Sequence, residues 1–305
     1  MEVVLYAYRD DPAAIIARCR ELGVRQVCLL LEGMPGYAET GVPEPRALRE
    51  LAQTLADEGI ALSSGNGSTG RNPDLLLNPS AHRRELDAQL RTLESLSSAG
   101  IGALLYYQHF PHPVDPADET RYWDGLVAIT RELVAQAEAT NVRLAHHAVW
   151  RCLPPACRAD ARGRQTTMTD YPGYRHDDWD GPYLLSSHQD VARLIDAVPS
   201  SHNGVCFCTG MHIMGGDVPT LVETFKGRIH HAQMRDVRGR WPFAEEVFLG
   251  EGEVDFATIL RLLGAAGYDG VIGPEHLGEP RWTGDDPEAA AVAFLRQHLP
   301  DRPAA

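Results

Sequence analysis

Cysteines and long apolar runs are scarce in this 305-residue sequence. The six cysteines form no Cys-x-x-Cys pair, so we expect no disulfides and a reducing, cytoplasmic location. No run approaches the ~20 apolar residues that a transmembrane helix needs, so we expect no membrane partner. The first residues, MEVVLYAYRDD, lack the basic segment and long apolar stretch that mark a signal peptide.

Positive charge is also in short supply. Lys and Arg number 28 against 42 Asp and Glu, which gives a formal net charge of −14. Non-specific nucleic-acid binding requires a cationic surface, so this balance argues against a nucleic-acid partner. The hydrophobic fraction of 44% suffices for a buried core, and 305 residues suit one large α/β barrel or two modest domains.

Short apolar runs alternate with longer stretches of helical periodicity. The runs predict strands at 3–8, 24–32, 60–66, 101–107, 142–149, 204–208, 228–235 and 268–275. Helices are predicted at about 12–22, 45–59, 79–98, 119–140, 187–198, 217–226, 255–266 and 284–298. Strict alternation implies parallel strands with right-handed crossovers. Eight such units match a closed (β/α)8 TIM barrel, so we predict an α/β fold with one domain over 1–305.

The competing architecture is a doubly wound open sheet. That fold favours a Gly-rich phosphate-binding turn after its first strand, and the segment YAYRDDPAA contains no Gly-x-Gly-x-x-Gly. GNGSTG at 65–70 is not followed at once by a helix and lacks the P-loop lysine, so we interpret it as an active-site loop or a flexible connector. The barrel is therefore the favoured architecture.

The alternation breaks at 151–185, which is rich in Pro, Gly, Asp, Arg and aromatic residues. Because this insertion follows the fifth predicted strand, we expect a lid over that end of the barrel. Tyr171, Tyr174, His176 and Trp179 suit stacking on a sugar or an aromatic group. The alternative is an arm that contacts another subunit of a homo-oligomer.

Four successive predicted strands end in residue types that bind metals. They carry His146 and His147, then Cys206, Cys208 and nearby His212, then His230, His231, Gln233 and Arg235, and finally Glu275 and His276. Taken singly, each has an ordinary explanation as a rim residue, a buried cysteine or a helix cap. The ends of adjacent barrel strands converge on one axis, so together these residues predict a metal site.

The first four strands end in Tyr8, Glu32, Asn66 and the pair Tyr106 and Tyr107. We interpret these residues as ordinary polar residues at the rim of the barrel.

Strand alternation selects among the neighbours on the seventh strand. His231, Gln233 and Arg235 share one face, and that face carries the polar residues, so we expect it to point into the site. His230 belongs to the opposite face and is expected to cap the outside of the strand or lie under a helix.

The motifs of the second half resemble mannonate dehydratase, a sugar-acid lyase of the xylose isomerase-like barrel superfamily. LAHHAVW, FCTG, RIHHAQMR, GEGEVDF and GPEH follow in the order of the family patterns L-A-I-H-P-D-D, F-C-T-G, R-I-H-F-x-H-L-R, G-D-V-D-[MF] and R-P-D-H. The resemblance implies a divalent metal, Mn²⁺ first, with Fe²⁺, Co²⁺ or Zn²⁺ as alternatives. Carried over by position, its ligands are His147, Cys208, Gln233 and Glu275.

This chain departs from the family pattern at several positions. The family has His at the position of Gln233 and Asp at that of Glu275, and both replacements resemble the isomerase and epimerase branches of the superfamily. The acidic pair that follows the ligand histidine is absent from LAHHAVW. The family's G-L-P-R-I is also replaced by GPYLLSS, without the arginine. These departures open the question of whether the substrate is mannonate itself.

The resemblance suggests a role for His276, and position and chemistry suggest roles for other residues. It places His276 in the active site, where we expect it to transfer protons, and Arg235 is expected to hold a substrate carboxylate. The alternative for Arg235 is a salt bridge to Asp236 or Glu253 at the rim. Four further residues are candidates for substrate binding, namely Tyr107, His109, His212 and His231.

Three functions are compatible with this reading. The first is a metal-dependent lyase that dehydrates a sugar acid by removing an α-proton and eliminating a β-hydroxyl. The second is a metal-dependent keto-sugar isomerase or epimerase that acts through an enediol. The third is a barrel protein without catalytic activity. Cys208, His147 and the Pro-Glu-His motif favour the first, whereas Gln233 and Glu275 favour the second.

Overall fold

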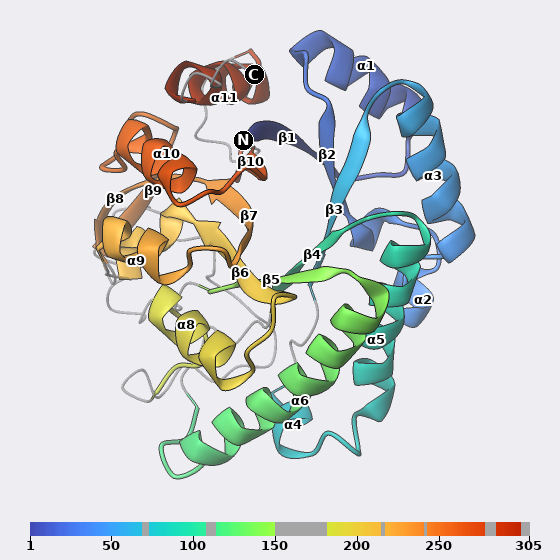
Figure 1. The fold of residues 1–305 in the computed structure, drawn as a ribbon, viewed down its shortest axis with the longest axis vertical. Helices are drawn as coiled ribbons and strands as arrows, with labels where there is room; N and C mark the ends of the chain where they lie inside the picture. The colour runs from blue at the N-terminus through green and yellow to red at the C-terminus, as the bar shows by residue number, and fades with distance from the viewer. Residues whose placement is uncertain are drawn as a thin grey trace.

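The computed structural model describes residues 1–68, 73–107, 114–149, 182–214, 217–240, 243–277 and 285–299 (Figure 1). Eight parallel strands close into a barrel in the order β1-β10-β7-β6-β5-β4-β3-β2. They are β1 (Glu2–Ala7), β2 (Gln26–Leu30), β3 (Ala61–Ser68), β4 (Ala103–Tyr107), β5 (Arg143–His147), β6 (Asn203–Cys208), β7 (Ile229–Met234) and β10 (Val271–Pro274). Pairing of Glu2 with Val271 and of Val3 with Ile272 closes the ring, which confirms the predicted (β/α)8 architecture.

Helices surround the strands and alternate with them along the chain (Figure 1). The main ones are α1 (Pro12–Leu22), α3 (Pro45–Asp57), α5 (Arg83–Ser98), α6 (Glu119–Thr140), α8 (His188–Ala197), α9 (Val218–Thr224), α10 (Phe256–Ala265) and α11 (Pro287–His298). Shorter pieces are η1 (Leu31–Gly33), α2 (Tyr37–Thr40), α4 (Asp74–Leu77) and η2 (Thr209–Met214). Among the helices that the structure describes, none is long and apolar enough to cross a bilayer.

Capping residues set the helix boundaries where the sequence places them. The side chains of Asp11, Asp217, Asp255 and Asp286 each accept a hydrogen bond from a backbone N–H in the first turn of α1, α9, α10 and α11. Proline occupies the start of α1, α3, α9 and α11, where its missing N–H costs nothing. These residues fix where the helices begin after the preceding strands.

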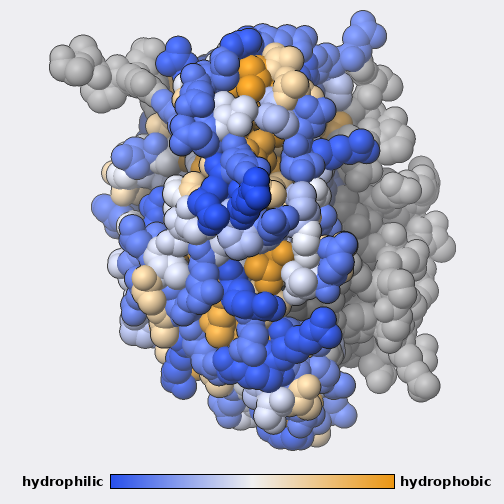
Figure 2. Space-filling view, turned by 90° about the vertical axis from the view of Figure 1, so that its right-hand side faces the viewer, coloured by the Kyte–Doolittle hydropathy of each residue, from blue (hydrophilic) through white to orange (hydrophobic). Residues whose placement is uncertain are grey.

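The core has two layers. Inside the barrel, a small cluster is formed by Val4, Cys28, Leu105, Ala145 and Cys206. A much larger cluster fills the space between the strands and the surrounding helices. The helices bury one apolar face and leave the other polar, so the side of the molecule that bears α3 is mostly hydrophilic, with small separate apolar spots (Figure 2).

An antiparallel hairpin follows β7, in a segment for which neither strand nor helix was predicted. Its strands are β8 (Asp236–Arg240) and β9 (Phe243–Val247), paired from Asp236 with Val247 to Arg240 with Phe243. The hairpin forms a sheet of its own outside the ring of barrel strands (Figure 1). The predicted lid at 151–185 lies outside the described residues except for 182–185.

Candidate metal centre and active site

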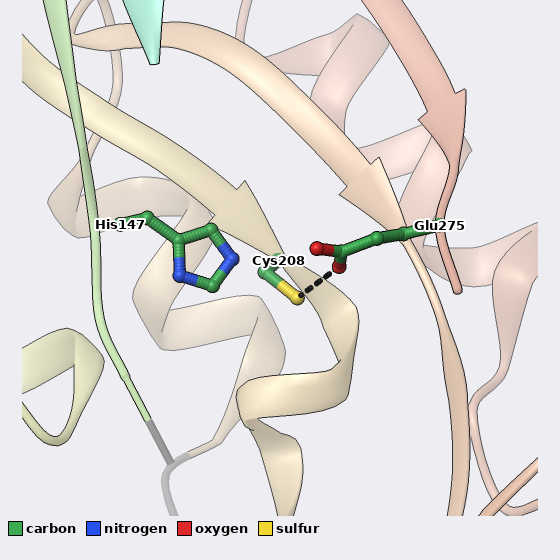
Figure 3. A group of neighbouring side chains, drawn as sticks. All are labelled: His147, Cys208 and Glu275. Atoms are coloured by element: carbon green, nitrogen blue, oxygen red, sulfur yellow. Dashed lines mark hydrogen bonds between the residues drawn. The ribbon is translucent and has the colours of Figure 1, made fainter. Parts of the chain in front are cut away.

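Three predicted metal ligands meet at the carboxyl ends of the barrel strands. His147 ends β5, Cys208 ends β6 and Glu275 directly follows β10. One ligand atom from each side chain lies within 4.8 Å of the other two. Figure 3 shows these side chains facing one another, with the thiol of Cys208 3.6 Å from the Oε2 atom of Glu275. The convergence that was expected from the strand ends is therefore present.

The imidazole of His147 is prepared to act as a ligand. Its Nδ1 donates a hydrogen bond to the carbonyl of Ala148, while its buried Nε2 has no partner among the described residues. Burial lowers the pKa of His147 to about 4, so the ring is neutral near pH 7 and Nε2 carries a lone pair. A bonded Nδ1 that fixes the tautomer and orientation is typical of histidine ligands. The ring of Tyr107 stacks on the imidazole at a centroid distance of 4.7 Å.

Cys208 and Glu275 complete a donor set that fits a divalent cation. Burial raises the pKa of the Cys208 thiol to about 12, so the sulfur keeps its proton in the absence of a metal. Burial also disfavours the charged form of Glu275, but the positive charges of His276 and Arg235 hold its pKa well below the usual range. A bound cation would replace the thiol proton, and one nitrogen, one sulfur and one carboxylate oxygen suit a borderline transition metal.

Gln233, the fourth predicted ligand, lies on β7 within the same pocket. Its side chain is buried, and its Nε2 donates to the hydroxyl of Tyr107 at 3.1 Å. Its Oε1 accepts from the thiol of Cys206 at 3.4 Å. The amide is thus held by protein groups on both sides, and its role as a fourth ligand stays a prediction.

His231 reaches the pocket through Tyr6. The hydroxyl of Tyr6 lies 3.0 Å from Nε2 of the buried His231. Burial lowers the pKa of His231 to about 3 and raises that of Tyr6 well above its usual value, so both groups are neutral near pH 7. Gly273 makes room for the phenol, because a Cβ there would lie 2.5 Å from the Tyr6 hydroxyl. Next to His231 on β7, the Nδ1 atom of His230 donates to the carbonyl of Leu144 on β5 at 2.6 Å, so the contact found is with a strand and not with a helix.

Arg235 directly follows β7 and is buried, with 4% of its surface exposed. Its Nε lies 3.6 Å from Oε1 of Glu246 and its Nη1 lies 3.9 Å from Oε2 of Glu275. Both backbone groups of Arg235 bond to the Thr209 hydroxyl, at 2.8 and 2.7 Å. A Cβ at Gly210 would lie 2.2 Å from Nε, so a glycine is required beside the guanidinium.

The two rim carboxylates proposed as partners of Arg235 are engaged elsewhere. Asp236 accepts from the backbone N–H groups of Gly250, Gly252 and Val254 at 2.8–3.1 Å. Glu253 pairs with Arg240 at 3.1 Å. The ion pairs of Arg235 therefore involve carboxylates that the sequence analysis did not assign to it.

His276 lies beside Glu275, Glu246 and Arg235. Its Nδ1 is 3.1 Å from Oε1 of Glu246, and its Nε2 is 3.4 Å from Oε1 of Glu275. Burial acts to lower the pKa of His276, but the carboxylates of Glu275 and Glu246 raise it to about 9. The ring is therefore charged near pH 7.

A pocket of about 290 Å³ opens over these groups. Its described lining comes from both halves of the barrel and consists of Tyr6, Tyr8, Leu30, Glu32, Asn66, Tyr107, Gln233, Glu275 and His276. Of the residues proposed for substrate binding, Tyr107 lines the pocket and His231 contacts it through Tyr6. His109 lies outside the described residues, and His212 is placed by its backbone alone, within η2.

Two kinds of site residue were not predicted from the sequence. Glu32 lies just after β2, in η1, and Asn66 lies near the end of β3; we treated both as rim, whereas they line the pocket. The available signal was their position at the carboxyl ends of barrel strands. Glu246 comes from the unexpected hairpin, and no motif in the sequence marks it.

Known proteins resemble this chain in sequence and in fold. It is 32% identical over 100 residues to mannonate dehydratase of Oceanobacillus iheyensis, a match that covers 31% of this chain and 29% of the relative. It is 39% identical over 90 residues to mannonate dehydratase of Brucella canis, covering 27% of this chain and 21% of that relative. Each match thus spans less than a third of the relative's length.

Solved structures match almost the whole chain. Mannonate dehydratase from Streptococcus suis serotype 2 superposes with a TM-score of 0.72 at 17% identity, covering 98% of this chain and 93% of that one. An L-ribulose 3-epimerase gives a TM-score of 0.71 at 16% identity, covering 98% and 94%. The model of the xylose isomerase-like TIM-barrel family matches residues 16–298. This chain therefore belongs to the xylose isomerase-like TIM-barrel family.

Proposed function

We propose that this protein is a metal-dependent lyase that dehydrates a sugar acid, with mannonate as the first substrate to test. The observation that carries the proposal is the meeting of His147, Cys208 and Glu275 beside the charged ring of His276. The partial matches to mannonate dehydratases support the same reaction class. Mn²⁺ is the first metal to test, because the resemblance favours it over Fe²⁺, Co²⁺ and Zn²⁺.

The dehydration moves two protons and breaks one carbon–oxygen bond. A base takes the α-proton, the β-hydroxyl leaves with a proton from an acid as water, and the resulting enol becomes a 2-keto-3-deoxy acid. A divalent cation held by His147, Cys208 and Glu275 would stabilise the negative charge that develops on substrate oxygens.

His276 suits the role of the acid. It lines the pocket, and its pKa of about 9 keeps the ring charged at neutral pH, so it has a proton to give to the departing hydroxyl. Tyr107 and Tyr6 also face the pocket, and burial raises the pKa of both well above the usual value. They remain protonated and can orient substrate hydroxyls.

Arg235 belongs to a charged cluster on one side of the pocket. Its guanidinium is almost fully buried, and it lies within 3.3 Å of both ring nitrogens of His276. The carboxylates of Glu246 and Glu275 balance these two cations, so a bound divalent cation would supply the net positive charge on this side of the pocket, where we expect the substrate carboxylate to bind.

A keto-sugar epimerase or isomerase is the second candidate. Gln233 lines the pocket, and both Gln233 and Glu275 resemble that branch of the superfamily more than they resemble the dehydratases. An epimerase moves a proton between carbons through an enediol and eliminates no hydroxyl. The two candidates therefore differ in their products.

One experiment separates these functions. The purified protein is analysed for metal, treated with a chelator, reloaded with Mn²⁺ and incubated with mannonate. We expect about one ion per chain and formation of a 2-keto-3-deoxy acid only after reloading. Conversion of a ketose or aldose without any keto-deoxy product would favour the epimerase. Absence of a bound ion, together with activity that resists the chelator, would exclude a metal enzyme.

A further inference from the structure

The hairpin after β7 delivers a buried carboxylate to the back of the active site. Glu246, on β9, pairs across the hairpin with Val237, and its side chain has no exposed surface. Asp236 secures the base of the hairpin through four bonds to the backbone N–H groups of Val237, Gly250, Gly252 and Val254, each 2.8–3.1 Å long. The position of Glu246 is therefore fixed by local backbone structure.

Glu246 contacts two cationic groups at once. Its Oε1 lies 3.6 Å from Nε of Arg235 and 3.1 Å from Nδ1 of His276. Its Oε2 lies 3.3 Å from the same Nδ1. A buried carboxylate is stable only when paired charges and hydrogen bonds compensate its desolvation, and these two neighbours supply that compensation.

His276 needs to be held in place. Its backbone has φ of 59°, in the left-handed region that non-glycine residues rarely adopt. The side chain is partly exposed toward the pocket, and Nη1 of Arg235 lies 3.2 and 3.3 Å from its two ring nitrogens. Without a carboxylate on the Nδ1 side, the neighbouring guanidinium would disfavour this position of the ring.

We propose that Glu246 is a positioning residue: its carboxylate holds Nδ1 of His276, so that the opposite ring edge faces the substrate pocket beside Glu275. This inference rests on the proposed function, because it assigns to Glu246 an effect on the proton transfer by His276. Other catalytic histidines are held in the same way, by a carboxylate that orients the ring for proton transfer.

The geometry separates this role from substrate and metal binding. The described residues that line the pocket include Glu275 and His276 but not Glu246. The predicted metal ligands His147, Cys208 and Glu275 lie on other elements of the barrel. Loss of the Glu246 carboxylate should therefore change kcat and leave KM and metal affinity in place.

The test uses the Mn²⁺-loaded protein and two variants of Glu246. Glu246→Gln keeps the shape but removes the charge, and Glu246→Asp keeps the charge but retracts it from Nδ1. We expect each to lower kcat for mannonate about 10- to 100-fold, as loss of an orienting partner does elsewhere, with KM and the Mn²⁺ dissociation constant within about twofold. Glu253→Gln, at the exposed ion pair with Arg240, is the matched control and should keep the wild-type kcat.

A spectroscopic measurement keeps the inference testable without turnover. In Zn²⁺-loaded, ¹⁵N-histidine-labelled protein, the Nδ1 signal of His276 is assigned by its loss in His276→Asn. We expect this signal to move in both Glu246 variants and to stay in Glu253→Gln. If the wild-type protein does not dehydrate mannonate, the proposed function fails, while the NMR shift still decides the positioning role. An unmoved signal, an unchanged kcat in either folded Glu246 variant, or a parallel loss of metal affinity would overturn the inference.

Discussion

The two halves of the barrel contribute different chemistry to one pocket. The strands β5, β6, β7 and β10 supply nitrogen, sulfur and charged groups, namely His147, Cys208, Arg235 and Glu275. The strands β1 to β4 supply tyrosines, an amide and one carboxylate, namely Tyr6, Tyr107, Asn66 and Glu32. We infer a division in which the second half performs the reaction and the first half recognises the substrate.

The difference in burial explains why the charges gather on one side. Arg235 and Glu246 are nearly inaccessible, the side chain of Glu275 is 11% exposed, and each of the three has an oppositely charged group within 4 Å. Such groups are tolerated in the interior only as a compensated cluster, so moving one of them to the other half would leave the rest unpaired. The residues of the first half need no such network because most of them are neutral.

Removal of the predicted ligand His147 on β5 is the strongest test of the difference between the two halves of the barrel. We expect His147→Ala to weaken Mn²⁺ binding at least about 100-fold and to abolish turnover, because loss of a direct ligand exceeds the effect of loss of its supporting groups. His146→Ala is the control on the same strand. It should keep its metal but lose about 2–4 kcal/mol of stability, since His146 is buried, bonded to Asn203 at 2.7 Å and packed on Tyr106. Isothermal titration calorimetry measures the Mn²⁺ affinity, and urea unfolding measures the stability. Equal Mn²⁺ affinities in the two variants would contradict the assignment of His147 as a metal ligand.

The pH dependence of metal binding tests the thiol of β6. The pKa of Cys208 is raised to about 12 and that of His147 is lowered to about 4, so near pH 7 only the thiol must lose a proton to bind a metal. Affinity should therefore rise about tenfold per pH unit between pH 6 and 8. Cys208→Ser should bind more weakly and lose most of this slope. A slope near zero in the wild-type protein would show that Cys208 does not bind as a thiolate.

The fold and the metal cluster could be predicted because both depend on repeated local patterns. Asp11 and Asp255 cap helices within their own segments, and apolar runs mark the strands. Once the barrel is assumed, the ends of parallel strands must converge, which predicts a metal site there; the resemblance to mannonate dehydratase then singled out His147, Cys208 and Glu275 among the candidates.

The remaining residues of the site depend on contacts that no local pattern encodes. Tyr6 reaches His231 across 225 positions because β1 and β10 close the ring and Gly273 leaves space for the phenol. Glu246 is brought to His276 by a hairpin whose position depends on the side-chain bonds of Asp236. Residue type and spacing alone did not distinguish Tyr6 and Glu246 from polar residues outside the site.

A substitution in the first half should affect recognition alone. Asn66 lines the pocket from β3, a strand whose residues carry no charged side chain. We expect Asn66→Ala to raise KM about tenfold, the equivalent of one hydrogen bond of ~1.4 kcal/mol, with kcat and Mn²⁺ affinity retained. Ser63→Ala, on the same strand but bonded to the carbonyl of Val27, is the control for effects on folding. A fall in kcat without a change in KM would contradict the inference that the first half of the barrel only recognises the substrate.

The smallest effect is expected where the two halves meet at the outside of the barrel. Arg18 of α1 pairs with Asp286 at 2.5 Å and Glu288 at 2.7 Å, which join α1 to the start of α11. We expect Arg18→Ala to lower the free energy of unfolding in urea by less than about 1 kcal/mol, and 1 M salt to reduce the difference, because the pair is partly exposed.

The bond to Arg18 lowers the pKa of Asp286 to about 2 from its ordinary 3.8. The stabilisation is therefore present above pH 3.8 and is lost as the pH falls toward 2. KM and Mn²⁺ affinity should not change, and a change in either would mean that closure of the ring at this seam sets the geometry of the pocket.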